Sequence, residues 1–466
     1  MKILLVVPAV ARLRVTSRED SVPPRAMLRF SILPVTTVAA LTPPEHRVEV
    51  CDENVEPVDL RTDADVIGLS LMTATAARGF ELASWFRSRG KIVVAGGYHA
   101  TLCPDDVLAH VDAVVMGDAE ETWPALLRDL EAGRLQRVYR SQGTCDLAKV
   151  PVPRRDLTRT TARHYVTTGA VQAGRGCSHG CRYCSVTAFH QRTYRARPLD
   201  AVIAEVREVP RNFIFVDDNI IADPSYAREL FERLAPLRKR WVSQCSLSIA
   251  DDPELLALAS AAGCRGLFIG LETTSPENLA AVDKGFNDSD RYRDRLEAIE
   301  RAGIGVIAGM IVGMDGDDAS VFERTLDFLT RSPINALQLN IMTPLPGTPL
   351  FADMKRAGRI VDEDYEHYDF RHCVIRPARM TAQELQDGAD WLYAQYYRLD
   401  RVVWRTLRTL FAVGLQTAYL TWRLNMTYRF DNRREGIRGR NPAATRRSSR
   451  QPRTSPTPPV TTANAN

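Results

Sequence analysis

The sequence lacks a second pair of closely spaced cysteines, and it lacks a convincing transmembrane run. Three of its nine cysteines fall between positions 177 and 184, and no C-x2-C pair occurs elsewhere in the 466 residues. The best candidate for a membrane span is the uncharged run 409–422, which is shorter than the ~20 residues that cross a bilayer. Met1-Lys2 leads directly into the apolar run ILLVV with no secretory signal, so we expect reduced cysteines and a cytoplasmic protein.

Acidic residues are nearly absent from one basic segment. Residues 433–453 contain eight arginines and one acid, a charge of about +7, whereas the whole chain carries +4. By subtraction, the net charge of the remaining residues is about −3. We therefore expect no nucleic-acid partner. Residues 433–466 are rich in Pro, Ser, Thr and Arg, and we expect them to form a disordered basic tail.

The stretch AGRGCSHGCRYCSV places Cys177, Cys181 and Cys184 in a C-x3-C-x2-C pattern, with Tyr183 before the last cysteine. Three thiolates on one loop can hold three corners of a [4Fe–4S] cluster and leave the fourth iron open to a small chelating molecule. The alternative is a structural zinc site, which needs four ligands. His179 or His190 would then complete it, although His179 would have to fold back inside the loop.

Residues 1–140 alternate short apolar runs with helix-length segments, which predicts a parallel sheet covered on both faces. We expect strands over 2–7, 47–53, 65–72, 91–97 and 113–117, and helices over 34–41, 76–89, 104–110 and 121–133. Ligands of such sheets bind at the carboxyl ends of the strands. The residues at or just past those ends are Ser70, Thr73, Gly96, Gly97, His99, Gly117 and Glu120.

After a linker at 141–164, residues 165–345 contain six strand-like runs that alternate with helices. The runs are 166–174, 211–217, 240–248, 265–272, 304–313 and 335–342. Six such units predict a parallel sheet that curls toward a barrel, with its chemistry at the carboxyl ends of the strands. The cysteine loop follows the first run, and the candidate residues after the others are Asp217, Asp218, Asn219, Glu272, Gly309 and Gly313.

The cysteine loop with its aromatic residue resembles the radical SAM superfamily, and the GGYHAT and GDAEET turns resemble the cobalamin-binding domains of its members. The resemblance spans about residues 1–400. It implies an α/β protein with a flavodoxin- or Rossmann-like cobalamin-binding domain, a partial (β/α)6 barrel and a C-terminal helical region. It also implies three cofactors, namely a [4Fe–4S] cluster on the three cysteines, S-adenosyl-L-methionine (SAM) and cobalamin.

The resemblance further implies contacts to the cofactors. Tyr183 and the six candidates at the barrel strand ends would lie near SAM, and the seven candidates of the first domain near cobalamin. The chain departs from the family pattern at three places: Asp217-Asp218-Asn219 replaces Gly-Gly-Glu, Gly316 beside Asp315 replaces an acid, and no D-x-H-x-x-G histidine follows the first strand. The last departure leaves open a vestigial domain that no longer binds cobalamin.

The implied reaction is reductive cleavage of SAM to a 5′-deoxyadenosyl radical, followed by methylation of an unactivated carbon of a lipid or secondary metabolite. The alternative is an oxidative cyclisation or rearrangement without methyl transfer. A cobalamin sensor and an electron-transfer protein fit less well. We expect flavodoxin or ferredoxin as the reducing partner and assign no catalytic side chain.

Residues 346–432 form the expected helical cap that would set substrate identity. Aromatic residues at helical spacing, among them Trp391 and Tyr396, indicate a core. The run 409–422 predicts a helix buried against the barrel, with a helix at a membrane interface as the alternative. That alternative makes a lipid substrate and peripheral membrane contact reasonable expectations.

Overall fold

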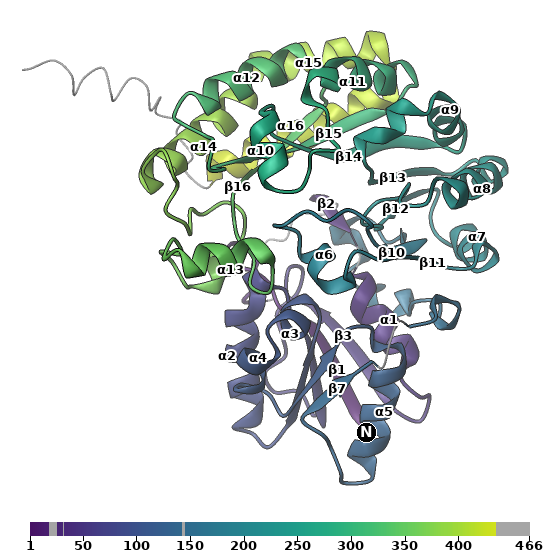
Figure 1. The fold of residues 1–466 in the computed structure, drawn as a ribbon. Helices are drawn as coiled ribbons and strands as arrows, with labels where there is room; N and C mark the ends of the chain where they lie inside the picture. Colours follow the sequence, from purple (N-terminus) through teal and green to yellow (C-terminus); the bar gives the residue numbers. More distant parts are fainter. Residues whose placement is uncertain (18–25, 31, 142–144, 435–466) are drawn as a thin grey trace, which may run out of the picture.

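The computed structural model describes residues 1–17, 26–30, 32–141 and 145–434. Figure 1 shows an N-terminal α/β domain below, a larger α/β domain above it, and C-terminal helices along the outer side of the larger domain. The predicted basic tail at 433–466 lies almost entirely outside the described residues. The domain boundaries expected from the sequence stay predictions.

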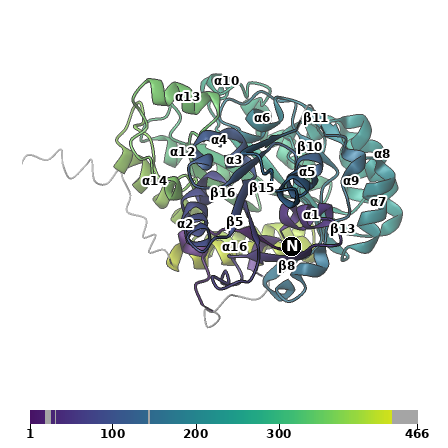
Figure 2. The same ribbon diagram turned by 90° about the horizontal axis from the view of Figure 1, so that it is seen from below.

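The N-terminal sheet is entirely parallel, with strand order β3-β1-β4-β5-β6-β7. Its strands are apolar because helices bury both faces, α1 and α5 on one face and α2 to α4 on the other; the view from below in Figure 2 shows these layers. The strands are β1 (Lys2–Val7), β3 (Arg47–Asp52), β4 (Val66–Ser70), β5 (Ile92–Gly96), β6 (Ala113–Met116) and β7 (Val138–Arg140). The helices are α1 (Leu33–Leu41), α2 (Ala76–Arg87), α3 (Tyr98–Leu102), α4 (Pro104–Leu108) and α5 (Ala119–Glu131).

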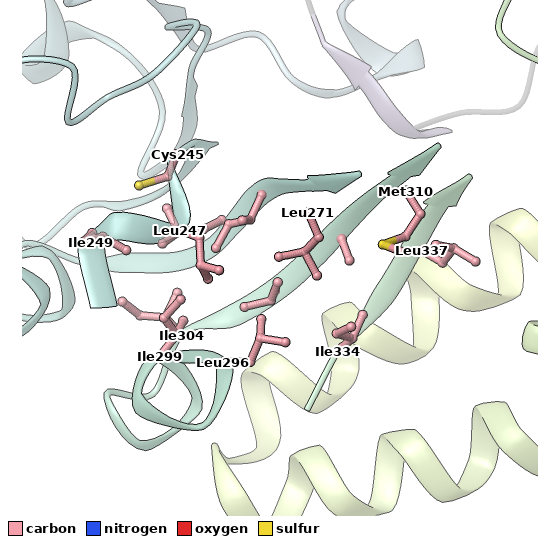
Figure 3. Packing of buried hydrophobic residues seen from close by; sticks show 14 of the residues in the cluster. Cys245, Leu247, Ile249, Leu271, Leu296, Ile299, Ile304, Met310, Ile334 and Leu337 are labelled. Atoms are coloured by element: carbon pink, nitrogen blue, oxygen red, sulfur yellow. The ribbon is translucent and has the colours of Figure 1, made fainter. Parts of the chain in front are cut away.

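The second domain contains an open six-stranded parallel sheet of order β16-β15-β14-β13-β12-β9, as the six βα units predict. Its strands are β9 (Ala170–Val171), β12 (Asn212–Phe215), β13 (Arg240–Gln244), β14 (Cys264–Glu272), β15 (Gly305–Val312) and β16 (Ala336–Ile341). The helices that alternate with the strands are α7 (Leu199–Glu208), α8 (Pro224–Leu234), α9 (Pro253–Ala261), α10 (Pro276–Ala281), α11 (Tyr292–Arg301), α12 (Val321–Arg331) and α13 (Pro349–Arg356). Figure 3 shows apolar side chains of strands and helices, among them Leu271, Leu296 and Ile304, packed into its core.

The first predicted barrel strand, 166–174, is wrong as one element. Its beginning is β8 (Tyr165–Thr167), which pairs with β2 (Ala26–Phe30), and only β9 joins the barrel sheet. Gly169 separates β8 from β9. A Cβ at Gly169 would lie 2.9 Å from the Cβ of Phe213, so the chain passes close to β12 at this point. The end of the run belongs to β10 (Gly174–Gly176), which pairs antiparallel with β11 (Tyr194–Ala196) and carries the chain into the cysteine loop.

Three helices end the described chain, α14 (Ala382–Tyr396), α15 (Leu399–Ala412) and α16 (Leu415–Arg434). The aromatic residues of α14 are buried in the barrel core, as expected. The predicted single helix over 409–422 is wrong, because Gly414 adopts φ +117° and divides the run between α15 and α16. None of the described helices is both long and apolar enough to span a membrane.

Candidate active site

A cavity of about 890 Å³ lies where the carboxyl edge of the N-terminal sheet meets the barrel. Ser70, Gly96 and Gly117 line it from the ends of β4, β5 and β6. Arg175 and Asp218 line it from the barrel side, at β10 and just past β12. The two sheets therefore direct their ligand-binding edges into one shared space.

The sheet side of this cavity is apolar and shaped by glycine. Leu5, Val94 and Val115 contribute side chains to it. Gly97 has φ +96°, and a Cβ there would lie 2.8 Å from the carbonyl oxygen of Leu71, closer than backbone tolerates. Glycine therefore lets the β5–α3 turn lie against the backbone just after β4, at a place where Gly97 also lines the cavity.

Five of the seven residues predicted to contact cobalamin line the cavity, and two do not. The five are Ser70, Gly96, Gly97, Gly117 and Glu120. Thr73 is buried at the start of a 3-10 turn beside α2. His99 is buried, with Nε2 3.2 Å from Asp106 Oδ2 and its ring 4.7 Å from the Tyr365 ring, and burial lowers its pKa. His99, on α3, thus contacts α4 through Asp106 and the C-terminal region through Tyr365.

An ion-pair bridge joins the two domains beside the cavity. Arg175 donates from Nη1 to Asp118 Oδ1 (2.8 Å) and from Nη2 to Glu120 Oε1 (2.7 Å). Arg195 donates to the other oxygen of Asp118 (2.6 Å). Burial opposes ionisation of Asp118, but the two guanidinium groups outweigh it and lower its pKa. Asp118, Glu120, Arg175 and Arg195 are called the domain bridge below.

Glu120 keeps one oxygen for a ligand. Its Oε1 is held by Arg175, whereas its Oε2 is buried and has no hydrogen-bond partner in the described structure. A buried acceptor without a donor is costly, so a donor group bound in the cavity would satisfy it. The corrin ring of cobalamin carries amide side chains that supply such donors.

The cysteine loop runs from β10 to α6 (Ser185–His190), which Figure 1 shows at the junction of the two domains. Cys177, Cys181 and Cys184 are unpaired; Cys181 is buried and the other two half-buried. Burial raises the pKa of Cys177 and, more strongly, that of Cys181, to about 11. Within the described residues no three metal-binding side chains already form a metal site. Three thiols on one short, half-buried loop nevertheless provide the donor set that a three-cysteine cluster needs.

The two histidines of the zinc alternative are engaged elsewhere. The His179 ring stacks on the ring of Phe286, with centroids 3.8 Å apart. His190 is buried, and its Nδ1 lies 3.2 Å from Arg195 Nη2. Burial lowers the pKa of His190 to about 4. Within the described residues, neither histidine joins the cysteines in a group of three metal-binding side chains.

The Asp-Asp-Asn triplet after β12 accepts hydrogen bonds from backbone N–H groups. Asp217 is fully buried and accepts from the N–H groups of Ala173 (2.9 Å) and Gly174 (2.6 Å). Asp218 accepts from the N–H of Gly176 (2.9 Å) and also lines the cavity. Asn219 Oδ1 accepts from the N–H of Ser246 (3.0 Å). The two aspartates therefore fix β10, the strand from which the cysteine loop begins, and Asp218 alone faces the cavity.

Glu272 and Tyr183, predicted separately, meet in the structure. The Tyr183 hydroxyl donates to Glu272 Oε1 (2.9 Å), and the Lys284 ammonium donates to the same oxygen. Glu272 adopts φ +69°, an uncommon backbone conformation for glutamate that the end of β14 imposes. Lys284 was not predicted from the sequence, because the residues next to it in the chain form no motif that indicates a site. This trio ties the cysteine loop to the end of β14.

The two β15 glycines occupy different surroundings. Gly309 faces the ring of Phe268 within the sheet, whereas Gly313, at φ +94°, packs against Leu385 of α14. Gly316 stands where the family pattern has an acid; the next residue, Asp317, accepts through Oδ2 from the N–H groups of Gly313 (2.9 Å) and Met314 (3.0 Å). Asp315, considered from the sequence, instead pairs with Arg359 at the surface.

The C-terminal region reaches the cavity mouth through residues that sequence reasoning passed over. Asp369 and Phe370 line the cavity, and Phe370 adopts φ +66°. The carbonyl oxygen of Phe370 accepts from the N–H of Ile341 at the end of β16 (2.8 Å). The region predicted to set substrate identity thus contributes an aromatic side chain to the shared space.

Two family models match the chain, each over the domain where the corresponding chemistry is expected. The Radical SAM superfamily matches residues 171–329, and the B12 binding domain matches residues 33–127. The first range contains the whole cysteine loop, and the second contains four of the five predicted strands of the N-terminal sheet.

Similar proteins include bacteriochlorophyllide d C-12(1)-methyltransferase of Chlorobaculum tepidum, 28% identical over 73% of this chain and 76% of that protein. The hopanoid C-2 methylase of Rhodopseudomonas palustris is also 28% identical, over 70% of this chain and 64% of that protein. Among solved structures, the radical S-adenosylmethionine methyltransferase TsrM of Kitasatospora setae, with cobalamin and a [4Fe-4S] cluster bound, has a TM-score of 0.65 at 16% identity. That similarity covers 94% of this chain and 100% of TsrM and supports the fold. Residues 171–329 of this chain therefore form a radical SAM domain, and a B12-binding domain over residues 33–127 precedes it.

Proposed function

We propose that this protein is a cobalamin-dependent radical SAM enzyme that methylates an unactivated carbon of a small molecule or lipid. With a cluster, SAM and cobalamin bound, such a site supplies a 5′-deoxyadenosyl radical and a transferable methyl group. The observation that carries the proposal is the shared cavity. It joins the glycine-rich edge of the B12-binding domain to Arg175, two residues before Cys177.

The residues of the chain have distinct tasks in this proposal. Cys177, Cys181 and Cys184 hold the cluster and leave one iron for SAM. Asp217 and Asp218 fix the strand that precedes the loop through backbone hydrogen bonds. The apolar sheet side of the cavity offers a surface on which an apolar part of a ligand can be buried.

The domain bridge has a positioning role in the same proposal. Arg175 lies close in sequence to the first cluster cysteine and contacts the B12-binding domain directly through Asp118 and Glu120. A methyl donor and a substrate radical react only when held at bonding distance and orientation. The bridge therefore sets the separation between the two cofactors.

The substrate fits the description of a hydrophobic metabolite or lipid. The cavity walls are largely aliphatic, and one similar protein, the R. palustris enzyme, is a hopanoid methylase. We also propose a flavodoxin or ferredoxin as the electron donor and a cytoplasmic location, since nine unpaired cysteines suit a reducing compartment.

Isotope transfer in cells tests the proposal while the substrate is still unidentified. The full chain is expressed in a host fed methionine with a trideuterated methyl group, next to a Cys181→Ala variant. We expect the wild-type lipid or metabolite extract to contain a compound heavier by one labelled methyl group, and the variant extract to lack it. A compound that depends on Cys181 but carries no label would instead establish cyclisation or rearrangement. Identical extracts in a host known to supply the substrate class would contradict enzymatic activity on that class.

A further inference from the structure

Helices α15 and α16 direct polar residues toward the rest of the protein and apolar residues outward, the opposite of an ordinary surface helix. Thr409 and Asn425 are fully buried, and Arg405 is nearly so. Asn335, next to β16, donates from Nδ2 to Thr409 Oγ1 (3.0 Å) and to Thr421 Oγ1 (3.1 Å). Asn425 in turn donates to the carbonyl oxygen of Asn335 (2.8 Å). Hydrogen bonds, rather than apolar packing, hold much of this helical hairpin to the barrel.

The outward side of the same hairpin is apolar. Seventeen large apolar side chains are exposed in the described residues, and nine of them lie between 399 and 430. Phe411 is 85% exposed, Leu415 76% and Trp404 68%. The nine are called the apolar face: Leu399, Val403, Trp404, Leu407, Phe411, Leu415, Tyr419, Trp422 and Phe430.

Helical geometry makes the apolar face continuous. At about 100° per residue, its α15 members span an arc of about 140°, and Arg405 and Thr409 point the opposite way. The α16 members span an arc of about 80°, opposite Thr421 and Leu424. A contiguous patch of this kind on a folded protein marks an interaction surface. Figure 1 shows α15 at the edge of the molecule farthest from the N-terminal sheet, so the face does not line the cavity.

The net charge around the apolar face is positive. Residues 399–430 contain five arginines and one acid, Asp400, which pairs with Arg398, and the chain continues past α16 into the segment 433–453 with its eight arginines and one acid. A second copy of this face would bring arginines against arginines, which disfavours self-association. An anionic lipid surface complements both features, because it offers apolar depth and negative charge together.

We propose that the apolar face docks on the surface of an anionic lipid bilayer, with α15 and α16 lying in the interfacial plane. Trp404, Tyr419 and Trp422 are the residue types that settle at the headgroup level, and Phe411 and Leu415 flank the turn that enters deepest. Arg423 and Arg429, which lie beside the α16 members of the face, contact lipid phosphates, whereas Arg405 points into the protein. The inference rests on the surface alone and is independent of the proposed C-methylation, because binding to vesicles does not require a loaded active site.

Flotation of the full-length protein with vesicles tests the proposal. Vesicles of phosphatidylcholine alone are compared with vesicles that contain phosphatidylglycerol, using the wild type, Phe411→Ser/Leu415→Ser, and the control Val152→Ser/Val361→Ser. Val152 and Val361 are also exposed apolar residues but lie outside the apolar face. We expect the wild type and the control to float with anionic vesicles, and Phe411→Ser/Leu415→Ser to lose about tenfold or more of its partitioning.

Several results would overturn the docking proposal. They are no flotation of the wild type with anionic vesicles, equal flotation of the Phe411→Ser/Leu415→Ser variant, or a concentration-dependent dimer that this variant abolishes. The last result would assign the face to a second copy. Both positions are exposed, so the variant should melt at the wild-type temperature, and Trp404→Ser provides a second variant with the same expectation. Failure of the labelled-methyl experiment would leave these outcomes unchanged.

Discussion

Arg175 is the residue on which the alignment of the two domains depends. It belongs to the strand that enters the cysteine loop, yet its guanidinium contacts two carboxylates of the other domain. These partners lie more than fifty positions away in the sequence, and both are mostly shielded from water. Sequence reasoning selected Glu120 as a cofactor contact and did not foresee that the same side chain holds the barrel.

Replacing Asp118 with Asn tests the domain bridge. The pKa of Asp118 is lower in the folded than in the unfolded chain, so its carboxylate stabilises the fold above its unfolded pKa of about 3.9, and this contribution is lost as pH falls through the folded pKa. Asp118→Asn should therefore cost about 2–3 kcal/mol at pH 7 and less near pH 3. Urea unfolding at both pH values measures the difference.

Asp156→Asn is the matched control, because Asp156 also pairs with an arginine but on the surface. Its cost should stay below about 1 kcal/mol. An equal cost for the two variants at pH 7, or a cost of Asp118→Asn that does not change with pH, would show that the bridge does not contribute as described.

At the scale of elements, the turn between β5 and α3 determines whether a ligand can reach the sheet edge. Gly97→Ala would force φ +96° on an L-residue and place a methyl group 2.8 Å from the Leu71 carbonyl oxygen. We expect a loss of about 1–3 kcal/mol in stability and weaker binding of hydroxocobalamin, measured by equilibrium dialysis. Iron content after reconstitution should not change, because the cysteine loop is untouched.

Gly285→Ala controls for the loss of a glycine, since a Cβ at that position meets nothing within 4 Å and φ is not positive. Hydroxocobalamin affinity equal to that of the wild type in Gly97→Ala would contradict a cobalamin site at this turn. A loss of iron in Gly97→Ala would point to a global rather than a local effect.

The elements predictable from the sequence are those with long apolar runs. β1, β4 and β5 are buried on both faces, so their composition alone identifies them. β7, β8 and β10 have three residues each and show no periodicity, so only tertiary pairing identifies them. The prediction of one buried helix over 409–422 failed for a related reason. The large apolar residues of this run do not face the core, and Gly414 divides the run between two helices.

The residues of the candidate site were likewise only partly predictable from the sequence. The cysteine loop is local in sequence, so its spacing identified it. Lys284 acts through a contact with Glu272 that sequence spacing does not encode, whereas Asp317 accepts from backbone N–H groups only three and four residues before it. His99 followed the expected glycines and yet turned away from the cavity, because the short helix α3 directs its ring toward Asp106 and Tyr365.

At the scale of the whole molecule, two parallel sheets share one cavity, and a helical hairpin with an apolar face lies on the opposite side of the barrel. The first arrangement places the glycine-rich edge of the N-terminal sheet beside Arg175, on the strand that enters the cysteine loop. The second would hold the enzyme at the surface where a hydrophobic substrate resides. These two features are structurally separate, so each can be removed by mutation without the other.

We expect one chain to hold both cobalamin, in this cavity, and an iron–sulfur cluster, on the adjoining cysteine loop. The most direct test is metal content after anaerobic purification and reconstitution with iron, sulfide and hydroxocobalamin, for the wild type and for a Cys177→Ala/Cys181→Ala/Cys184→Ala variant. The account predicts about four irons and about one cobalt per wild-type chain, and a variant that retains cobalt but loses iron. Zinc in place of iron, or iron without any cobalt, would contradict it.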